Sequence, residues 1–243
     1  TNTYFVGENF QERGLAVLSL SGEPADFFGQ DSGILVQDFK PLWEIPLHLE
    51  FYENDGLLGF HHDAGASVGG ENSWILPQKM LNISSRNQYG GGHIEYQVFP
   101  DNPRTRFEDL ILRTSGNDWA NTLFRDGMMQ GNAASTADLD IQAFRPVSTF
   151  INGVYYGIYN LREKQDKEYA EMYHAIPADS LDYIENDGEV KEGDDQAYQQ
   201  MVAMLNAGLQ TDSAFQHFSM ICDTRNFTDY IIAEIFSANT SWG

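Results

Sequence analysis

The decisive stretch is PVSTFINGVYYGIYNL, residues 146–161, in which two runs rich in β-branched and aromatic residues flank Asn152-Gly153. Such runs are typical of β-strands. Asn-Gly is the pair that a two-residue hairpin turn prefers, because both turn positions need a left-handed backbone. The stretch therefore predicts a β-hairpin with strands at 146–151 and 155–161 and its tip at Asn152-Gly153.

Strand-like segments also fill the chain before this hairpin. They are short apolar or alternating runs bounded by turn residues, at 15–20, 33–36, 46–52, 64–68, 79–85, 94–99 and 110–113. The run at 46–52 is followed by Asn54-Asp55-Gly56, which is a second hairpin-turn signal. The first part of the chain is therefore predicted to be an antiparallel, β-rich region.

Helical patterns dominate the rest of the chain. One helix is predicted among the strands, from Asp118 as its capping residue to Gln130. Later stretches with a helical period lie at 165–174, 196–206, 213–221 and 226–238. This order predicts an α+β architecture, with a β-rich part at 1–163 and a helical part at 164–243.

The composition excludes several classes of protein. The 243 residues hold 36 acidic and 14 basic side chains, a formal net charge of -22, which disfavours binding to nucleic acid. No apolar run reaches the roughly 18 residues that a membrane-spanning helix needs. The segment Thr1–Tyr4 has no signal-peptide pattern. A single cysteine, Cys222, excludes an internal disulfide and lies in an apolar stretch typical of a core.

Three local features point toward a nucleotide. A strand ending in Gly69-Gly70 precedes Lys79, and such glycines let backbone N–H groups approach phosphate oxygens while a lysine neutralises them. The strand at 155–163 would be a hinge that meets an adenine. The order of glycine-rich turn, lysine, helix, strands and helical part is the order of elements in protein kinases. Each feature also has a plain reading, as a turn, a solvent-facing lysine or a buried strand.

Other polar groups give weaker signals. His61, His62 and Asp63 are adjacent on a strand, where neighbours point to opposite faces, so they do not converge easily on a metal. Asp138, Asp140 and Asp194-Asp195 are expected to be solvated acids, with a loosely held calcium left open. The sequence contains no P-loop, no Gly-x-Ser-x-Gly elbow and no His-Glu-x-x-His motif.

Taken together, five blocks resemble the CotH (spore coat protein H) kinase family. The similar blocks are GGENSWILPQK at 69–79, LRTSGNDW with FRD at 112–126, RPV with INGVYYGIYNLRE at 145–163, NFTDY at 226–230 and ANT at 238–240. They occur in the family's order and span the chain from about residue 33 to its end. One block alone would be weak, whereas five in order are specific.

The resemblance implies an atypical protein-kinase-like fold, with a β-rich N-lobe followed by an incomplete helical C-lobe. It implies ATP with Mg²⁺ or Mn²⁺ as cofactors, and phosphorylation of Ser or Thr in a protein substrate that is basic and Ser-rich. By this resemblance the cofactor-binding residues are Gly69, Gly70, Ser73, Lys79 and Glu163. Arg113 and Asp118 are expected to brace the lobe.

Two departures from the family pattern bear on activity. Ser241, two residues after Asn239, stands where the resemblance places the catalytic aspartate, and a serine cannot accept a proton as a carboxylate does. Trp74 replaces an arginine that is common in the family. The second metal-binding aspartate would lie beyond Gly243, so no metal ligand is assigned. We therefore expect this chain to be inactive, either as a truncated domain or as a non-catalytic relative.

Two other functions remain open. The fold could serve a non-enzymatic surface or extracellular interaction module, because fold does not fix function. It could also be associated with carbohydrate, if Trp43, Trp74 and Trp119 line one exposed groove. The exposure of these three rings separates the sugar-binding reading from the others.

Overall fold

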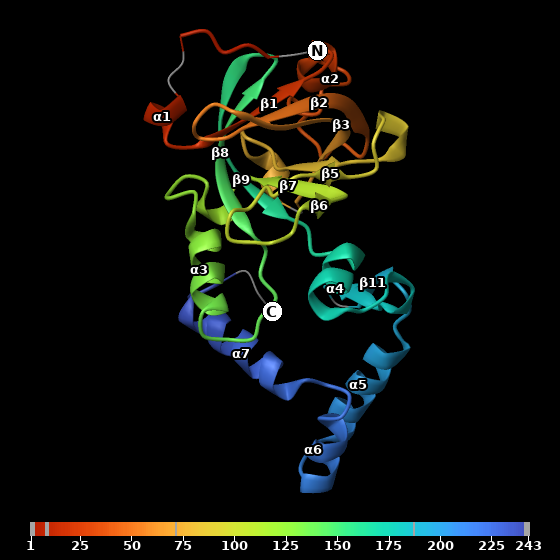
Figure 1. Ribbon diagram of the computed structural model, residues 1–243. Coiled ribbons are helices and arrows are strands. Elements are labelled where there is room, and N and C mark those ends of the chain that lie inside the picture. Colours follow the sequence, from red (N-terminus) through yellow and green to blue (C-terminus); the bar gives the residue numbers. More distant parts are fainter. Residues whose placement is uncertain (1–2, 8–9, 71, 187, 241–243) are drawn as a thin grey trace. The chain divides into compact units, whose positions relative to one another are not determined.

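A computed structural model describes residues 3–7, 10–70, 72–186 and 188–240 (Figure 1). The chain forms two compact units. The first takes in the residues up to Met128 together with Gln142–Lys164, and the second takes in Met129–Ile141 and the residues from Gln165 onward. No helix among the described residues is long and apolar enough to cross a membrane.

The first unit is built around a closed β-barrel. Its strands follow the order β1-β2-β3-β4-β7-β9-β8. Their bounds are β1 Ala16–Ser21, β2 Glu44–Tyr52, β3 Leu58–Val68, β4 Leu81–Ser84, β7 Asp109–Arg113, β8 Phe144–Ile151 and β9 Val154–Glu163. All neighbours pair antiparallel except β1 and β8, which run parallel in the register Ala16↔Val147 to Leu20↔Ile151. This parallel pair closes the barrel.

Smaller elements surround the barrel within the first unit. Helices α1 (Phe10–Arg13) and α2 (Pro24–Phe28) flank β1, and β5 (Ile94–Glu95) pairs with β6 (Arg106–Phe107). Short 3-10 turns lie at Ser73–Ile75, Asn87–Tyr89 and Gly116–Asp118. Helix α3 (Arg125–Ala134) begins in this unit.

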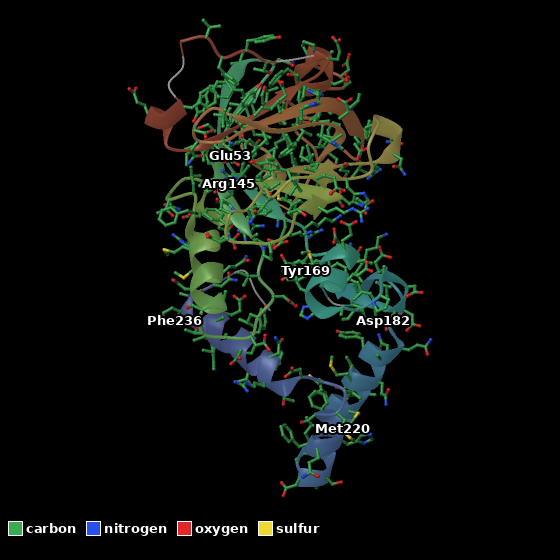
Figure 2. The ribbon with its side chains drawn as sticks, in the orientation of Figure 1. Glu53, Arg145, Tyr169, Asp182, Met220 and Phe236 are labelled. Atoms are coloured by element: carbon green, nitrogen blue, oxygen red, sulfur yellow. The ribbon has the colours of Figure 1, made fainter. Side chains whose placement is uncertain are left out.

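The barrel interior is an apolar core. Side chains that alternate along each strand point inward and are buried, among them Leu18, Leu20, Leu49, Phe51, Ala66, Leu81, Ile83, Leu112, Val147 and Leu161. Strands alternate their two faces in this way, so one face of each strand fills the barrel and the other faces outward. On the rim, Arg145 of β8 forms an ion pair with Glu53, which follows β2 (Figure 2).

The second unit is helical with one small sheet. Its elements are α4 (Lys167–His174), a 3-10 turn at Ala178–Ser180, β10 (Tyr183–Glu185), β11 (Glu189–Glu192), α5 (Gln196–Ala207), α6 (Asp212–Phe218) and α7 (Thr224–Phe236). Side chains cap three of the helices: Asp166 accepts from Tyr169 N at 3.0 Å, Thr211 from Ala214 N at 3.2 Å, and Asp223 from Asn226 N at 2.9 Å. These bonds satisfy amides that the first helical turn leaves unpaired.

The hairpin predicted at Asn152-Gly153 is confirmed. Strands β8 and β9 pair antiparallel up to Ile151↔Val154, and the φ angles of Asn152 and Gly153 are 49° and 80°. The turn at Asn54-Asp55-Gly56 between β2 and β3 is confirmed as well, with Glu53 N bonded to Leu57 O at 2.9 Å. Helices α4 to α7 begin within two residues of the four predicted starts and end within three residues of the four predicted ends.

The predicted kinase-like fold is wrong. We expected an antiparallel, β-rich N-lobe followed by an incomplete helical C-lobe, whereas seven strands close into a barrel. The closure depends on the parallel contact between β1 and β8, which are separated by more than a hundred residues. Strand patterns in a sequence are local, so they indicate where strands lie but not which strands pair.

Two single-element predictions are also wrong. Residues 33–36 form a turn, because their amides bond back to α2, with Ile34 N to Asp26 O at 2.9 Å and Leu35 N to Phe27 O at 3.0 Å. The run is apolar because Ile34 and Leu35 are buried in the core. The helix predicted from Asp118 begins at Arg125 instead, and Asp118 ends a 3-10 turn.

The hairpin tip offers a direct test of this architecture. The backbone N–H of Asn152 donates to Leu20 O at 2.8 Å, and its side-chain Oδ1 accepts from Gly22 N at 3.0 Å. The hairpin tip therefore holds β8 against the end of β1. Gly153 has a left-handed φ with open space around it, so Gly153→Ala adds backbone strain without a clash. We expect this change to lower the free energy of unfolding by about 1 kcal/mol, measured by urea titration with circular dichroism.

Gly131 provides the matched control for that substitution. It lies within α3, has an ordinary φ, and also has nothing near its Cβ position. Gly131→Ala should therefore leave stability unchanged or raise it by up to about 1 kcal/mol. Equal effects of the two alanines would contradict the left-handed turn at Gly153.

Candidate functional site

The loop between β3 and β4 holds most of the residues predicted to bind a cofactor. Gly69 N bonds to Met80 O at 2.9 Å, which extends the pairing of β3 with β4 by one step. Gly70 has a φ of 80°, and a Cβ there would lie 2.2 Å from the Ser73 hydroxyl. This left-handed φ favours glycine at that position. The fold therefore brings Gly69, Gly70 and Ser73 together, in a loop that we call the motif loop, residues 69–79.

Lys79 ends the motif loop as a buried cation. It is 5 % exposed, and its Nζ donates to Trp74 O at 2.5 Å and to Gln37 O at 3.1 Å. Among the described residues, no carboxylate forms an ion pair with this amine. Burial lowers the pKa of Lys79, and the charge of Asp38 opposes this lowering. Lys79 precedes β4 by two residues, so it does not project from a strand as predicted.

Strand β9 fastens the motif loop to the barrel. The buried Tyr159 hydroxyl donates to Lys79 O at 2.7 Å, and Gln78 Nε2 donates to Ile158 O at 3.0 Å. Gln78 also accepts from Trp119 Nε1 at 3.3 Å. Burial raises the pKa of Tyr159 well above its ordinary value, so this hydroxyl stays protonated. Three of the blocks that the sequence singled out, at 69–79, 112–126 and 145–163, therefore meet at one place.

Glu163, the remaining predicted cofactor ligand, is engaged elsewhere. It lies at the end of β9 and forms an ion pair with Arg104 at 3.3 Å, with both side chains 2 % exposed. Its other carboxylate oxygen accepts from Ala143 N at 3.0 Å and from Asn102 Nδ2 at 3.3 Å. These contacts make Glu163 part of a buried charge pair, and none of them involves the motif loop.

Asp118 and Arg113 hold the segment before α3. Asp118 is buried and accepts from the Thr122 hydroxyl at 2.6 Å and from Arg125 N at 3.1 Å. Burial raises the pKa of Asp118, but these hydrogen bonds and the Arg125 charge outweigh it, so the net pKa is lowered. Arg113 Nε lies 3.0 Å from Asp126. Both residues therefore make contacts within the chain, in keeping with a bracing role.

The two residues predicted to be catalytic are not assembled with the motif loop by anything the structure describes. Asn239 follows α7, and its side chain donates to Glu234 Oε2 at 2.6 Å. Ser241 lies outside the described residues. Their predicted roles therefore rest on the sequence alone.

The three tryptophans do not form an exposed groove. Trp43, Trp74 and Trp119 are all half-buried, and Trp43 and Trp74 pack against the hydrophobic core. Two of the indoles donate to groups of the chain: Trp43 to Ser32 O at 3.1 Å, and Trp119 to Gln78. The carbohydrate reading therefore loses the feature on which it depended.

Several histidines and acids outside the motif loop are bonded within the chain. His48 pairs with Asp63 at 2.6 Å, and His62 shares a short hydrogen bond with the buried Ser85 hydroxyl. In the second unit, Asp140 accepts from the Tyr169 hydroxyl at 3.2 Å and from His174 Nε2 at 2.7 Å. These contacts give each group a structural partner.

Sequence reasoning missed several residues that shape this site. Gln37, Gln78 and Tyr159 fix the motif loop, and Arg104 neutralises Glu163. Gln78 and Tyr159 lie inside the blocks 69–79 and 145–163 that resemble the family, so the sequence could have indicated them as site residues. Gln37 and Arg104 lie outside them, and no local pattern indicates their partners.

Comparison with known proteins gives a family match that covers the motif loop and the strands around it. A family model described as CotH kinase protein matches residues 66–241. The matched part begins within β3 and takes in the motif loop, the β8–β9 hairpin and α7. No curated protein matches the chain.

The buried pair of Arg104 and Glu163 yields a test that separates a structural from a ligand-binding glutamate. Removing one member of a buried ion pair leaves the other charge uncompensated, which costs about 3–5 kcal/mol. We expect Glu163→Gln and Arg104→Met each to lower the free energy of unfolding by this amount, measured by urea titration. In the double variant this free energy should fall by much less than the sum of the two single losses.

The exposed pair of Arg106 and Glu95, 3.4 Å apart, is the matched control. Glu95→Gln should change stability by less than about 0.5 kcal/mol, because solvent screens exposed pairs. Strictly additive losses at Arg104 and Glu163 would show that the two charges do not depend on each other.

Proposed function

The chain belongs to the CotH kinase family, and from that premise we propose that its motif loop binds the phosphate groups of ATP, while this chain does not itself transfer phosphate. The observation that carries the proposal is the buried Lys79 amine, which is held by two carbonyls and lacks a carboxylate partner among the described residues.

A buried ammonium without a counter-anion is unusual in so acidic a protein. Lys79 is nearly inaccessible, and burying a charge is costly unless an opposite charge compensates it. The chain carries 36 acidic residues, so carboxylates that could compensate are plentiful. An ammonium has three donors, and the described contacts of Lys79 use two. A phosphate oxygen would supply the missing charge and take the third donor.

The loop around Lys79 suits a phosphate in two further respects. Gly70 has a left-handed φ of 80°, a conformation typical of the turns whose N–H groups form anion-binding nests, with the Ser73 hydroxyl packed on its Cβ-free face. Trp74 O lies on the 3-10 turn at Ser73–Ile75, which is short and exposes Ile75. An anion at the third donor of the Lys79 amine would lie beside this turn, with the bond to Trp74 O kept.

Glu163 and Asp118 do not offer ligands to a divalent metal at the same place. A metal that bridges ATP phosphates needs carboxylate ligands near them. Glu163 is committed to Arg104, and Asp118 accepts hydrogen bonds from Thr122 and Arg125. We therefore assign Mg²⁺ or Mn²⁺ to no residue of this chain, although the name of the family implies such a cofactor.

Phosphoryl transfer also needs a base. Serine occupies position 241, where the resemblance places an aspartate, and a hydroxyl does not accept a proton at neutral pH as a carboxylate does. Loss of the base and of the metal clamp together costs several kcal/mol in the transition state, which is a factor of about a thousand or more in rate. The substrate class of the family, a Ser or Thr hydroxyl of a basic protein, would then not be phosphorylated by this chain alone.

A second candidate function is a non-enzymatic interaction module. It is favoured by α7, where Ile232, Ile235 and Phe236 are exposed, the last by 77 %. Such side chains normally lie against another surface. This function would be the better one if the motif loop bound no nucleotide.

Binding of ATP should raise the thermal stability of the chain through Lys79. We expect the melting temperature to increase with ATP in the absence of metal, since a ligand that binds only the folded state stabilises it. Lys79→Met should abolish the increase. Lys167→Met, which removes the same charge from an exposed position on α4, should leave it unchanged. An equal increase in the Lys79→Met protein would contradict the phosphate site.

The absence of transfer is tested in the same preparation. Incubation with labelled ATP, Mg²⁺ or Mn²⁺ and a basic Ser-rich protein should leave that protein and the chain unlabelled. Labelling that disappears in Lys79→Met would show that this chain holds a base and a metal site that we have not placed.

A further inference from the structure

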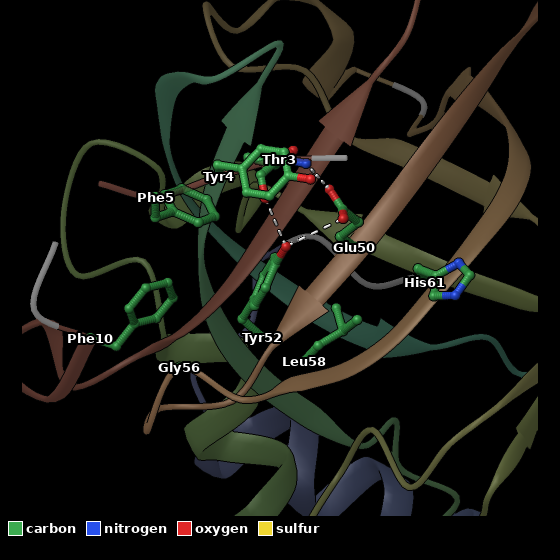
Figure 3. A pocket seen from close by; sticks show the side chains of 9 residues that line it. All are labelled: Thr3, Tyr4, Phe5, Phe10, Glu50, Tyr52, Gly56, Leu58 and His61. Atoms are coloured by element: carbon green, nitrogen blue, oxygen red, sulfur yellow. Dashed lines mark hydrogen bonds between the residues drawn. The ribbon is translucent and has the colours of Figure 1, made fainter. Parts of the chain in front are cut away.

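A pocket on the outside of the barrel has features of a cation site. The N-terminal segment, residues 3–7, contacts β1, β2 and β8 on the outside of the barrel and borders a space of about 540 Å³ that β2 and β3 also line (Figure 3). Aromatic rings from the segment and the barrel line it, together with one carboxylate, Glu50 of β2. The pocket lies wholly within the first unit and contains no residue of the motif loop.

Glu50 occupies an outward-facing position that the N-terminal segment has covered. In the barrel register Glu50 stands between Ser19 of β1 and His61 of β3, on the face opposite to the core residues Leu49 and Phe51. An outward glutamate is normally solvated. Here its exposed fraction is only 4 %. The carboxylate therefore lies at the bottom of the pocket and not on an open surface.

The contacts of Glu50 give it hydrogen bonds but no compensating charge. Thr3 N donates to one carboxylate oxygen at 2.7 Å, and the Tyr52 hydroxyl, which also donates to Thr3 O at 3.1 Å, lies 3.3 Å from the other. Figure 3 shows both bonds converging on the carboxylate. Among the described residues, no lysine, arginine or histidine forms an ion pair with Glu50. Burial and the negative charge of Glu50 raise the pKa of Tyr52 to about 12.

Aromatic rings make up the wall beside this carboxylate. Phe5 packs edge-on against Phe10 and Tyr52, with ring centroids 5.4 and 5.5 Å apart. The Tyr4 ring stands at the rim and is 80 % exposed. Faces of aromatic rings attract cations, most strongly where water is excluded. A single carboxylate among aromatic rings is a poor metal site, because hard cations need several oxygen ligands.

We propose that this pocket binds an alkylammonium group, with Glu50 neutralising its charge and the aromatic wall contacting its methyl or methylene groups. The group could belong to a lysine side chain or to a small quaternary amine such as choline, since both present the same charge and apolar surface. The proposal is independent of nucleotide binding at the motif loop.

Titration of the intact chain with choline tests this site. Choline and 3,3-dimethylbutanol have the same shape but differ in charge, so binding of choline alone identifies charge recognition. We expect saturable shifts in the NMR signals of residues 50–61 with choline and none with the neutral alcohol. Nα-acetyl-lysine N-methylamide, which keeps a free ε-ammonium group, is the second ligand. Its titration shows whether the site also accepts a lysine side chain.

Variants locate the binding and guard against unfolding. Glu50→Gln keeps one acceptor oxygen, for Thr3 N, places an NH2 group beside the Tyr52 hydroxyl and removes the charge, so it should weaken choline binding about tenfold or more. Tyr4→Ala removes a ring that is largely exposed, so the fold should tolerate it, and should weaken binding about three- to fivefold. Glu23→Gln, at an exposed position before α2, is the matched control and should have no effect.

Three results would overturn the proposal. These are equal binding of choline and its neutral isostere, wild-type affinity in both Glu50→Gln and Tyr4→Ala, and no saturable binding of either ammonium compound. Binding of choline but not of the lysine amide would restrict the site to small amines, and the reverse would restrict it to lysine side chains. Lys79→Met should leave all of these titrations unchanged, so failure here is distinct from failure of the phosphate site.

Discussion

The parallel pairing of β1 with β8 is the constraint on which the rest of the first unit depends. It joins the first strand of the barrel to a hairpin that forms more than a hundred residues later, and so turns a sheet with two open edges into a closed barrel. Closure removes the edges at which a sheet would pair with other chains. It also fixes β9, which carries Tyr159 and Ile158, against the motif loop.

The barrel separates two buried charges that sequence reasoning had placed in one site. Glu163 forms a neutral pair with Arg104, whereas Lys79 contacts two carbonyls and the Trp74 ring but no carboxylate among the described residues. On the outer face, Glu50 is buried without a counter-cation among the described residues. Buried charges without ionic partners are costly, and such groups cluster at binding sites. The same argument therefore supports both proposals: the buried positive charge of Lys79 would bind a phosphate anion, and the buried negative charge of Glu50 would bind an ammonium cation.

The sequence predicted those features that local chemistry determines. Asn152-Gly153 favours a left-handed turn wherever it occurs, and the helical period identified α4 to α7 without knowledge of their neighbours. Residues 33–36 were mistaken for a strand because a buried apolar turn has the same composition as a strand. Barrel closure, the Glu163–Arg104 pair and the partners of Lys79 all join residues distant in sequence. A single sequence carries no signal for such pairings. The resemblance to kinases implied a two-lobed fold, which the closed barrel contradicts.

Barrel closure is tested most directly by amide hydrogen exchange along β8. In a strand paired on both sides, successive amides point alternately to the two neighbours, here β9 and β1. Closure predicts that every amide from Val147 to Ile151 exchanges slowly, whichever neighbour it faces. Slow exchange at alternate residues only, with rapid exchange at those between them, would show that β8 is an open edge and would contradict the barrel.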